Sequence, residues 1–232
     1  MILIRQSQDR GHFNFGWLDT FHSFSFGDYR DPEHMGFRNL RVINEDKIQP
    51  AKGFGTHPHK NMEIITYVTK GELAHKDSMG NGSSILPGEV QYMSAGSGVT
   101  HSEFNKSKEE TTHLLQIWII PDREDTDPRY NQKSISKAQK KNRLYRIVGP
   151  DGSNAPIEIY QDVTVYASIL DVDVETFHTF ESNRYGWLQV VSGSLICNGK
   201  TLRAGDGASI SDERDVKFKA TIETEFLLFD LN

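Results

Sequence analysis

The sequence predicts an all-β protein made of two tandem copies of one β-barrel unit. Short strand-like runs recur at intervals of about 8 to 12 residues, separated by turns rich in glycine, proline and asparagine. No long segment has helical periodicity. The run TYVTKGEL at 66–73 resembles QVVSGSLI at 189–196, and each is followed by a glycine and an acidic residue, at 88–89 and 205–206. This weak repeat indicates two copies of one unit.

The first 50 residues are expected to hold a strand, a long loop and another strand. The runs ILIRQ at 2–6 and LRVIN at 40–44 have β-type composition, and the segment between them is rich in turn-forming residues. Between them, WLDTFHSFSF at 17–26 places His22, Phe24 and Phe26 on one side of an extended chain. Such a face is either part of the core or the wall of a pocket.

The next part of the chain is expected to be a series of short strands. Residues 62–82 read as strand, turn and strand, and residues 83–105 continue the pattern with two further turns. The run THLLQIWIIP at 112–121 is the most apolar strand and ends at its proline. His75 and His113 lie on candidate strands without a partner at ligand spacing, so we expect structural roles for both.

The chain is expected to divide at a polar segment. Residues 122–143 are charged and contain no apolar run, which predicts a linker that holds at most a short helix around 134–142. Strand signals return from residue 144. The predicted division is an N-terminal barrel at 1–121, a linker, and a C-terminal barrel at 144–232.

Composition indicates a globular protein of a reducing compartment. Cys197 is the one cysteine, so an intrachain disulfide and a cysteine-based metal site are excluded, and a cytoplasmic location is expected. No apolar run has the length of a signal peptide or of a membrane span. The net charge of −6 disfavours attraction to nucleic acid or anionic membrane. We therefore expect no direct nucleic-acid or membrane partner, and we interpret the basic run at 137–143 as a solvated connector.

Two pairs of residues with the same spacing predict a metal site. His57 and His59 flank a proline in the segment 53–71, and in an extended chain their side chains point the same way. His101 and Glu103 repeat this spacing. If the two segments are neighbouring strands, three imidazoles and one carboxylate converge on one point.

This set of side chains favours a catalytic metal over a structural one. Imidazole nitrogens with one carboxylate oxygen suit iron, copper, nickel, manganese or zinc, and the absence of thiolates argues against a closed structural zinc site. Three histidines and one glutamate leave coordination positions for a substrate or dioxygen.

The second copy is expected to have lost the site. Aligning the copies on their turn glycines replaces the ligand positions by Thr179, Glu181 and Phe218. We therefore expect one metal ion per chain, held in the first copy. His178, the one histidine of the second copy, is expected to be unrelated to metal binding.

The motifs resemble those of a known superfamily. One set of residues resembles the first cupin motif: Gly53, His57, His59, Glu63 and Gly71. The end of the second cupin motif is resembled by Gly98, His101 and Asn105. A proline usual in the second motif is Gly96 here, the gap from Gly53 to His57 is shorter than usual, and the spacing from Glu63 to Gly71 is one residue longer than usual.

These departures resemble one family, the pirins. The further matching runs are FHSFSF, MGFRNLRVIN, HKDSMGN and GEVQYMSAGSGVTHSEFN. The similarity covers residues 10–121 with specific motifs, and the chain length and degenerate second copy extend it to the whole chain. The chain is most similar to the short bacterial pirins.

The resemblance implies a bicupin, with two double-stranded β-barrels in tandem. It also implies one divalent transition metal per chain, with iron(II) expected and Zn, Ni, Cu, Mn or Co as alternatives. The implied ligands are His57, His59, His101 and Glu103. The general cupin pattern would use Glu63 as the carboxylate ligand. We prefer Glu103, since its spacing from His101 mirrors the first pair, and we give Glu63 a supporting role.

The function implied by the resemblance is that of a quercetin 2,3-dioxygenase. Dioxygen opens the flavonol ring, carbon monoxide leaves and a depside remains, with Glu103 as the base that takes the proton of the 3-hydroxyl group. An alternative is an iron- or redox-responsive regulatory protein that binds a protein partner, with incidental dioxygenase activity. A third interpretation is an isomerase or other cupin enzyme that uses its metal as a Lewis acid without redox chemistry.

Overall fold

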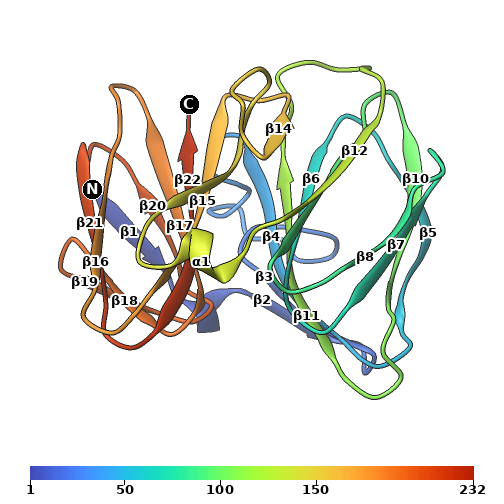
Figure 1. Ribbon diagram of the computed structural model, residues 1–232, viewed down its shortest axis with the longest axis horizontal. Helices are drawn as coiled ribbons and strands as arrows, with labels where there is room; N and C mark the ends of the chain where they lie inside the picture. Colours follow the sequence, from blue (N-terminus) through green and yellow to red (C-terminus); the bar gives the residue numbers. More distant parts are fainter. The chain divides into compact units, whose positions relative to one another are not determined.

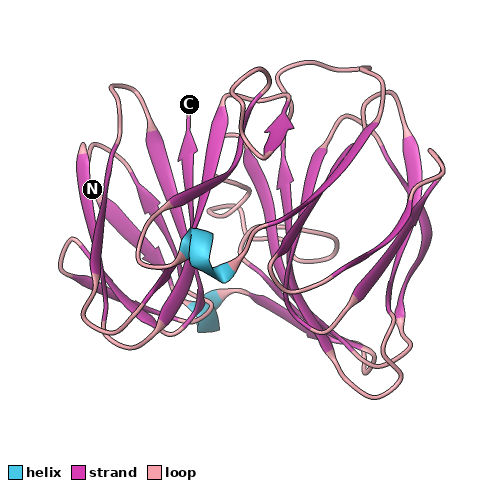
Figure 2. Ribbon diagram, in the orientation of Figure 1, coloured by secondary structure: helices cyan, strands magenta, loops and turns pink.

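The computed structural model describes residues 1–232, which lie mostly in antiparallel β-strands (Figure 2). The helices are a 3-10 turn at Ser7–Asp9 and one turn of α-helix, α1, at Lys137–Lys140. Neither helix is long or apolar enough to cross a membrane. The predicted all-β fold is confirmed, and it consists of two compact units, each made of one seven-stranded and one four-stranded sheet.

The N-terminal unit comprises Gly11–Ser134 and Ile159–Gln161. Its seven-stranded sheet has the order β12 (Arg129–Ser134), β9 (Glu89–Ser94), β6 (Glu63–Lys70), β11 (Thr112–Ile119), β4 (Leu40–Ile48), β3 (Leu18–His22) and β2 (Gly11–Asn14). Its four-stranded sheet has the order β5 (Gly53–His59), β10 (Val99–Asn105), β7 (Leu73–Asp77) and β8 (Gly82–Ile85). Figure 1 shows these strands in blue to green.

The two sheets of the N-terminal unit pack face to face. One buried cluster draws Leu18, Ile48, Val68 and Leu114 from the larger sheet and Leu73 and Ile85 from the smaller one. β11 is the most apolar strand and lies in the middle of the larger sheet between β6 and β4, which explains its continuous run of apolar residues. The unit is therefore a sandwich of two sheets rather than a closed barrel.

The C-terminal unit comprises Met1–Arg10, Ile135–Glu158 and Asp162–Asn232. Its larger sheet has the order β1 (Ile2–Arg5), β20 (Gly207–Ile210), β17 (Tyr185–Ser192), β22 (Thr224–Leu231), β15 (Val163–Leu170), β13 (Tyr145–Pro150) and β14 (Ile157–Ile159). Its smaller sheet has the order β16 (Glu175–Thr179), β21 (Asp215–Ala220), β18 (Ser194–Cys197) and β19 (Lys200–Arg203). Each sheet repeats the strand order of its counterpart in the N-terminal unit, which supports the repeat read from the sequence.

The boundaries of the two units differ from the predicted ones in two places. Within the expected linker 122–143, β12 pairs along its whole length with β9. β1, expected in the N-terminal barrel, pairs with β20 of the C-terminal unit. β12 is a polar edge strand, so no apolar run marks it, and the partner of β1 lies about two hundred residues away along the chain.

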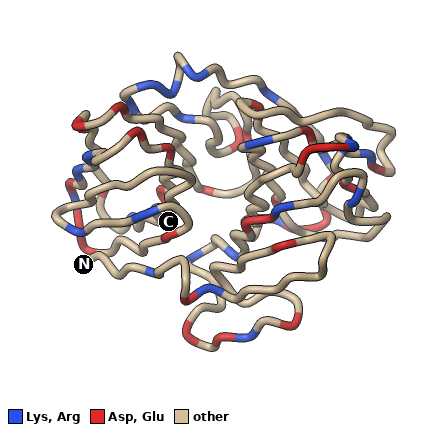
Figure 3. Tube along the Cα trace, turned by 90° about the horizontal axis from the view of Figure 1, so that it is seen from below, with Lys and Arg blue, Asp and Glu red and all other residues tan.

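Two lysines of the basic run at 137–143 are paired with acidic neighbours. Acidic and basic residues are interspersed along the chain (Figure 3). The ammonium group of Lys140 is buried 2.7 Å from the carboxylate of Glu225, and that of Lys141 lies 3.1 Å from Asp171. Ser136 and Gln139 cap the helix reciprocally, so these residues form a small folded connector.

Candidate metal centre

The segments that carry the candidate ligands are adjacent antiparallel strands. β5 and β10 pair with His57 opposite His101 and His59 opposite Val99, and the register shifts between His101 and Glu103. β5 is the edge strand of its sheet, which is where a strand tolerates the missing N–H of Pro58. The spacing in each strand and the pairing between strands thus bring three imidazoles together.

The three imidazoles form a compact cluster. One nitrogen of each of His57, His59 and His101 lies within 4.8 Å of the corresponding nitrogens of the other two. Nδ1 of His57 lies 2.7 Å from the carbonyl oxygen of Gly55, so it donates its proton there and Nε2 keeps a lone pair. Nε2 of His59 and Nε2 of His101 are buried without a hydrogen-bond partner. Buried orphan nitrogens of this kind are expected where a metal ion binds.

Burial keeps the imidazoles of His59 and His101 neutral. Desolvation, with the nearby His57, lowers the pKa of His59 to about 4. Desolvation, with the neighbouring histidines, lowers the pKa of His101 to about 3. Neutral imidazole is the form that coordinates a metal, so both side chains are ready to bind at neutral pH.

Glu103 lies on the other side of His101. His75, His101 and Glu103 form a second cluster in which the ligand atoms also lie within 4.8 Å of one another, so His101 belongs to both clusters. The carboxylate of Glu103 is buried and has weak contacts, 3.5 Å from Thr66 Oγ1 and 3.4 Å from Gln116 Nε2. Desolvation, with the nearby Asp46, raises the pKa of Glu103 to about 7.

Three hydrogen-bond donors occupy the carboxylate of Glu63, so it is not free to bind a metal ion. Its carboxylate accepts hydrogen bonds from the hydroxyl groups of Tyr92 and Ser94, each at 2.6 Å, and from the backbone N–H of Tyr160 at 2.9 Å. These bonds occupy both oxygens, which supports a structural role for Glu63. His113 is likewise structural, since its Nε2 lies 2.9 Å from Glu45.

His75 has a larger part in the site than the sequence indicates. Its Nε2 lies 3.1 Å from the carboxylate of Asp77, and Nε2 of Gln91 lies 3.0 Å from its Nδ1. The ring is stacked on Tyr130, and its Nδ1 lies 3.5 Å from Nδ1 of His101. Because both nitrogens of His75 are engaged, it orients His101 rather than offering a free ligand atom. The sequence feature that could have indicated this role is the spacing of His75 and Asp77, which matches that of the two predicted ligand pairs.

A cavity of about 330 Å³ opens beside the cluster. It lies within the size range of small-molecule sites, about 300 to 1,000 Å³. Its apolar lining residues are Phe26, Ile48, Phe54, Leu73, Leu114 and Trp118. Its polar lining residues are Asn44, Asp46, His57, His59, Glu103 and Gln116. Phe26, expected on a face that is either core or pocket wall, lines the pocket.

The C-terminal unit holds no cluster of three metal-binding side chains. Its strands β16 and β21 correspond to β5 and β10. Phe218 pairs with Cys197 as Glu103 pairs with His75, so Phe218 stands at the position of Glu103, and Val216 takes that of His101. His178 pairs with Val216 as His57 pairs with His101, so the positions of His57 and His59 are taken by His178 and Phe180. The predicted placements of Thr179, Glu181 and Phe218 are therefore wrong, because the loops between the aligned strands differ in length in the two units. His178 is bound through its Nε2 to Asp230 at 2.8 Å.

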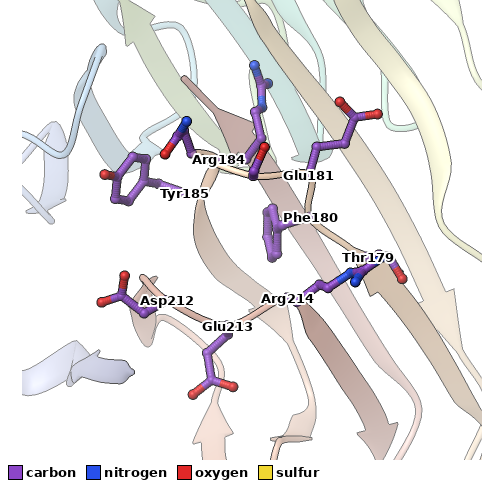
Figure 4. A pocket seen from close by; sticks show the side chains of 10 residues that line it. Thr179, Phe180, Glu181, Arg184, Tyr185, Asp212, Glu213 and Arg214 are labelled. Carbon is purple, nitrogen blue, oxygen red and sulfur yellow. The ribbon is translucent and has the colours of Figure 1, made fainter.

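A larger open cavity of about 840 Å³ lies in the C-terminal unit. Its walls are residues 179–185 and 212–214, whose side chains carry both signs of charge (Figure 4). Arg184 is already paired with Asp162 and Asp230. With no cluster of ligand atoms beside it, this cavity is not the candidate active site.

Comparison with known proteins agrees with the geometry. The profile described as Pirin matches residues 4–119, and the profile described as the quercetinase C-terminal cupin domain matches residues 146–231. The chain belongs to the pirin family. This pirin is 45% identical, over 100% of its length and 99% of the other's, to an Escherichia coli protein named quercetin 2,3-dioxygenase.

Two solved structures resemble this pirin closely. The crystal structure of YhhW from Escherichia coli has a TM-score of 0.96 and 44% identity, and the match covers 100% of this chain and 98% of that one. The crystal structure of bacterial pirin YhhW in complex with nickel(II) has a TM-score of 0.95 at 44% identity, covering 100% and 99%. The family predicted from the motifs is therefore confirmed.

Proposed function

We propose that the protein is a metal-dependent dioxygenase that opens the flavonol ring of quercetin-like substrates with dioxygen and releases carbon monoxide. One observation carries the proposal: three convergent imidazoles, two of them with orphan Nε2 atoms, lie at an apolar cavity of ligand size. The full-length similarity to a protein named quercetin 2,3-dioxygenase supports the choice of reaction.

The residues present fit one divalent metal ion. His57, His59 and His101 supply imidazole nitrogens, and Glu103 supplies a carboxylate on the far side of His101. No thiolate lies among them, so the set suits iron(II), our choice, or nickel(II), which the similar Escherichia coli pirin binds. When bound, the ion supplies Lewis acidity toward the 3-oxygen of the flavonol and a position for dioxygen.

Side chains of the cavity supply the base, the apolar walls and the contacts that position the base. Glu103, with its pKa raised to about 7, takes the proton of the flavonol 3-hydroxyl group at a carboxylate oxygen near neutral pH. The rings of Phe26, Phe54 and Trp118 form flat apolar walls that hold a planar substrate and exclude water. Gln116 and Thr66 keep the Glu103 carboxylate in place.

The test combines metal content and turnover in one preparation. Protein purified without oxygen is loaded with iron(II), and its metal content, quercetin consumption, oxygen consumption and carbon monoxide release are measured. We expect about one ion per chain and oxygen-dependent turnover, with Glu103→Gln slowed about 100-fold or more. His113→Ala, which changes a histidine bound to Glu45 outside the cluster, is the matched control and should remain active.

The outcome also decides between two classes of function. If the ion is bound but turnover is no faster than with free metal, the enzyme proposal fails. The protein would then be tested as a redox-responsive regulator by comparing the proteins it binds in the iron(II) and iron(III) states.

A further inference from the structure

A second compartment adjoins the cavity beside the histidine cluster. It has a volume of about 210 Å³ and shares four lining residues with the first compartment: Phe26, Asn44, Asp46 and Phe54. The remaining walls are provided mainly by β2 and β3 and the loop after them. A ligand bound at the histidines can therefore extend past the shared residues into a separate space.

Two oxygen atoms without partners stand at this junction, one on Asn44 and one on Asp46, whose carboxyl group also has a hydrogen bond with Thr20. Asn44 and Asp46 lie two residues apart on β4, so their side chains share one face of the sheet. Their exposed fractions are 4% and 5%, and Oδ1 of each is buried without a hydrogen-bond partner. Buried acceptors are normally satisfied, as the three donors to Glu63 illustrate in the same unit. The pair is thus built to accept hydrogen bonds from a bound molecule.

The walls of the second compartment indicate what that molecule is. Phe13 and Phe15 are stacked with ring centroids 6.1 Å apart, and His22 contacts both Phe13 and Phe26. A space enclosed by aromatic rings suits another flat ring. The two acceptors at its edge require that this ring carry donors, and hydroxyl groups meet both conditions.

We propose that Asn44 and Asp46 recognise hydroxyl groups on the part of the substrate that is remote from the metal-binding oxygen. The preferred substrates are then flavonols with a polyhydroxylated outer ring, and unsubstituted 3-hydroxyflavone is discriminated against. The assignment of a flavonol rests on the proposed function, whereas recognition of a phenolic ring by this compartment does not.

The first test uses probes that do not chelate metals. Resorcinol carries two hydroxyl donors, and 1,3-dimethoxybenzene has the same ring without donors. Binding of each to the metal-free full chain is measured by ligand-observed NMR titration. We expect resorcinol to bind about 10- to 100-fold more tightly, because a buried acceptor left unpaired weakens binding by that order. Equal affinities for the two probes would overturn the proposal without reference to any variant.

Variants of Asn44 and Asp46 test whether these two residues cause the preference for resorcinol over 1,3-dimethoxybenzene. Asn44→Leu and Asp46→Leu should each reduce the preference for resorcinol while leaving the affinity for dimethoxybenzene unchanged, whereas Asn44→Asp and Asp46→Asn retain an acceptor and should keep much of it. Glu45→Gln is the matched control, since Glu45 lies between them on β4 with its side chain on the other face, bound to His113. A merely structural defect would weaken both probes equally, and that result would contradict the proposal.

The second test separates this proposal from the dioxygenase assignment. Quercetin and 3-hydroxyflavone are compared as substrates of the iron-loaded protein, and kcat/KM for quercetin should be about 10- to 100-fold higher. Equal values would refute hydroxyl recognition and leave the dioxygenase intact. If neither flavonol is turned over but resorcinol binding depends on Asn44 and Asp46, the dioxygenase assignment fails and the phenol site stands.

Discussion

At the scale of single residues, the candidate site depends on which nitrogen of each histidine carries the proton. The carbonyl group of Gly55 fixes this for His57, and His75 lies against Nδ1 of His101. The orphan Nε2 atom of His101 is therefore a lone pair directed by its surroundings, and Nε2 of His59 is likewise buried without a partner. This preorganisation makes loss of a single ring costly for metal binding.

His59→Ala is expected to abolish stoichiometric metal binding while the β fold remains. The imidazole is one of the three proposed nitrogen ligands, and its removal leaves a set that holds first-row metals weakly. Elemental analysis after gel filtration gives the metal content, and circular dichroism checks the fold. His113→Ala should keep its metal. Full metal content in His59→Ala would remove this residue from the ligand set.

Metal binding is expected to release a proton from Glu103 below about pH 7. The raised pKa of Glu103, about 7, means that its carboxyl group is protonated below this value in the metal-free protein and must lose the proton to bind metal. Metal affinity should therefore rise with pH up to about 7 and then level off. His59 and His101, with pKa values of about 4 and 3, compete only in stronger acid.

Calorimetric titration in buffers of different ionisation enthalpy measures this proton release. In Glu103→Gln the released proton should disappear near pH 6, although some metal is still held by the histidines. Unchanged proton release in that variant would show that another group titrates on binding.

At the scale of secondary-structure elements, the close approach of β5 and β10 places the ligands. A Cβ atom at Gly53 would lie 2.1 Å from the carbonyl oxygen of Glu103 and 2.5 Å from Cα of Phe104. Both contacts are with backbone, which cannot move aside without separating the strands. Glycine at position 53 therefore sets the distance between the strand with two histidines and the strand with Glu103.

Gly53→Ala is expected to destabilise the N-terminal unit by about 1 to 3 kcal/mol through overpacking, and to weaken metal binding. Gly55→Ala is the matched control, because a Cβ atom there meets nothing within 4 Å. Denaturant midpoints with and without metal would measure both effects. Equal midpoints for the two variants would contradict the role given to Gly53.

Local spacing predicted part of the site and missed the rest for a physical reason. Alternation along an extended chain was enough to group His57 with His59 and to point to His101, because side-chain direction in a strand depends only on sequence parity. The binding role proposed for Asn44 and Asp46 depends on the strands beside β4 and on the cavity in front of it. Those neighbours are set by long-range pairing, which parity does not encode.

At the scale of the whole chain, each unit takes the edge strand of its larger sheet from outside the range predicted for that unit. β12 occupies the first position in the sheet of the N-terminal unit beside β9, and β1 occupies the same position beside β20 in the C-terminal unit. The first strand of the sequence therefore belongs to the last unit. The turn glycines revealed the repeat, but not which segment supplies each edge strand.

Ile2→Ala is expected to destabilise the C-terminal unit by about 2 to 4 kcal/mol, because Ile2 is buried in the core cluster of that unit. Leu3→Ala is the matched control on the same strand, since Leu3 is 56% exposed, and it should change stability by less than about 0.5 kcal/mol. Unfolding can be followed by the fluorescence of Trp187 with the other two tryptophans replaced by phenylalanine. Equal effects of both substitutions would mean that β1 does not pack as described.

The pairing of β1 with β20 also orders events during synthesis. Residues 2–5 emerge from the ribosome about 200 residues before their partners at 207–210. At about 5 to 20 residues per second, the first strand waits roughly 10 to 40 s for its partner. The segments of the N-terminal unit have all been made by residue 161, so that unit can fold in the meantime. The nascent chain thus carries an unpaired apolar strand, open to pairing with other chains, until residues 207–210 have been made.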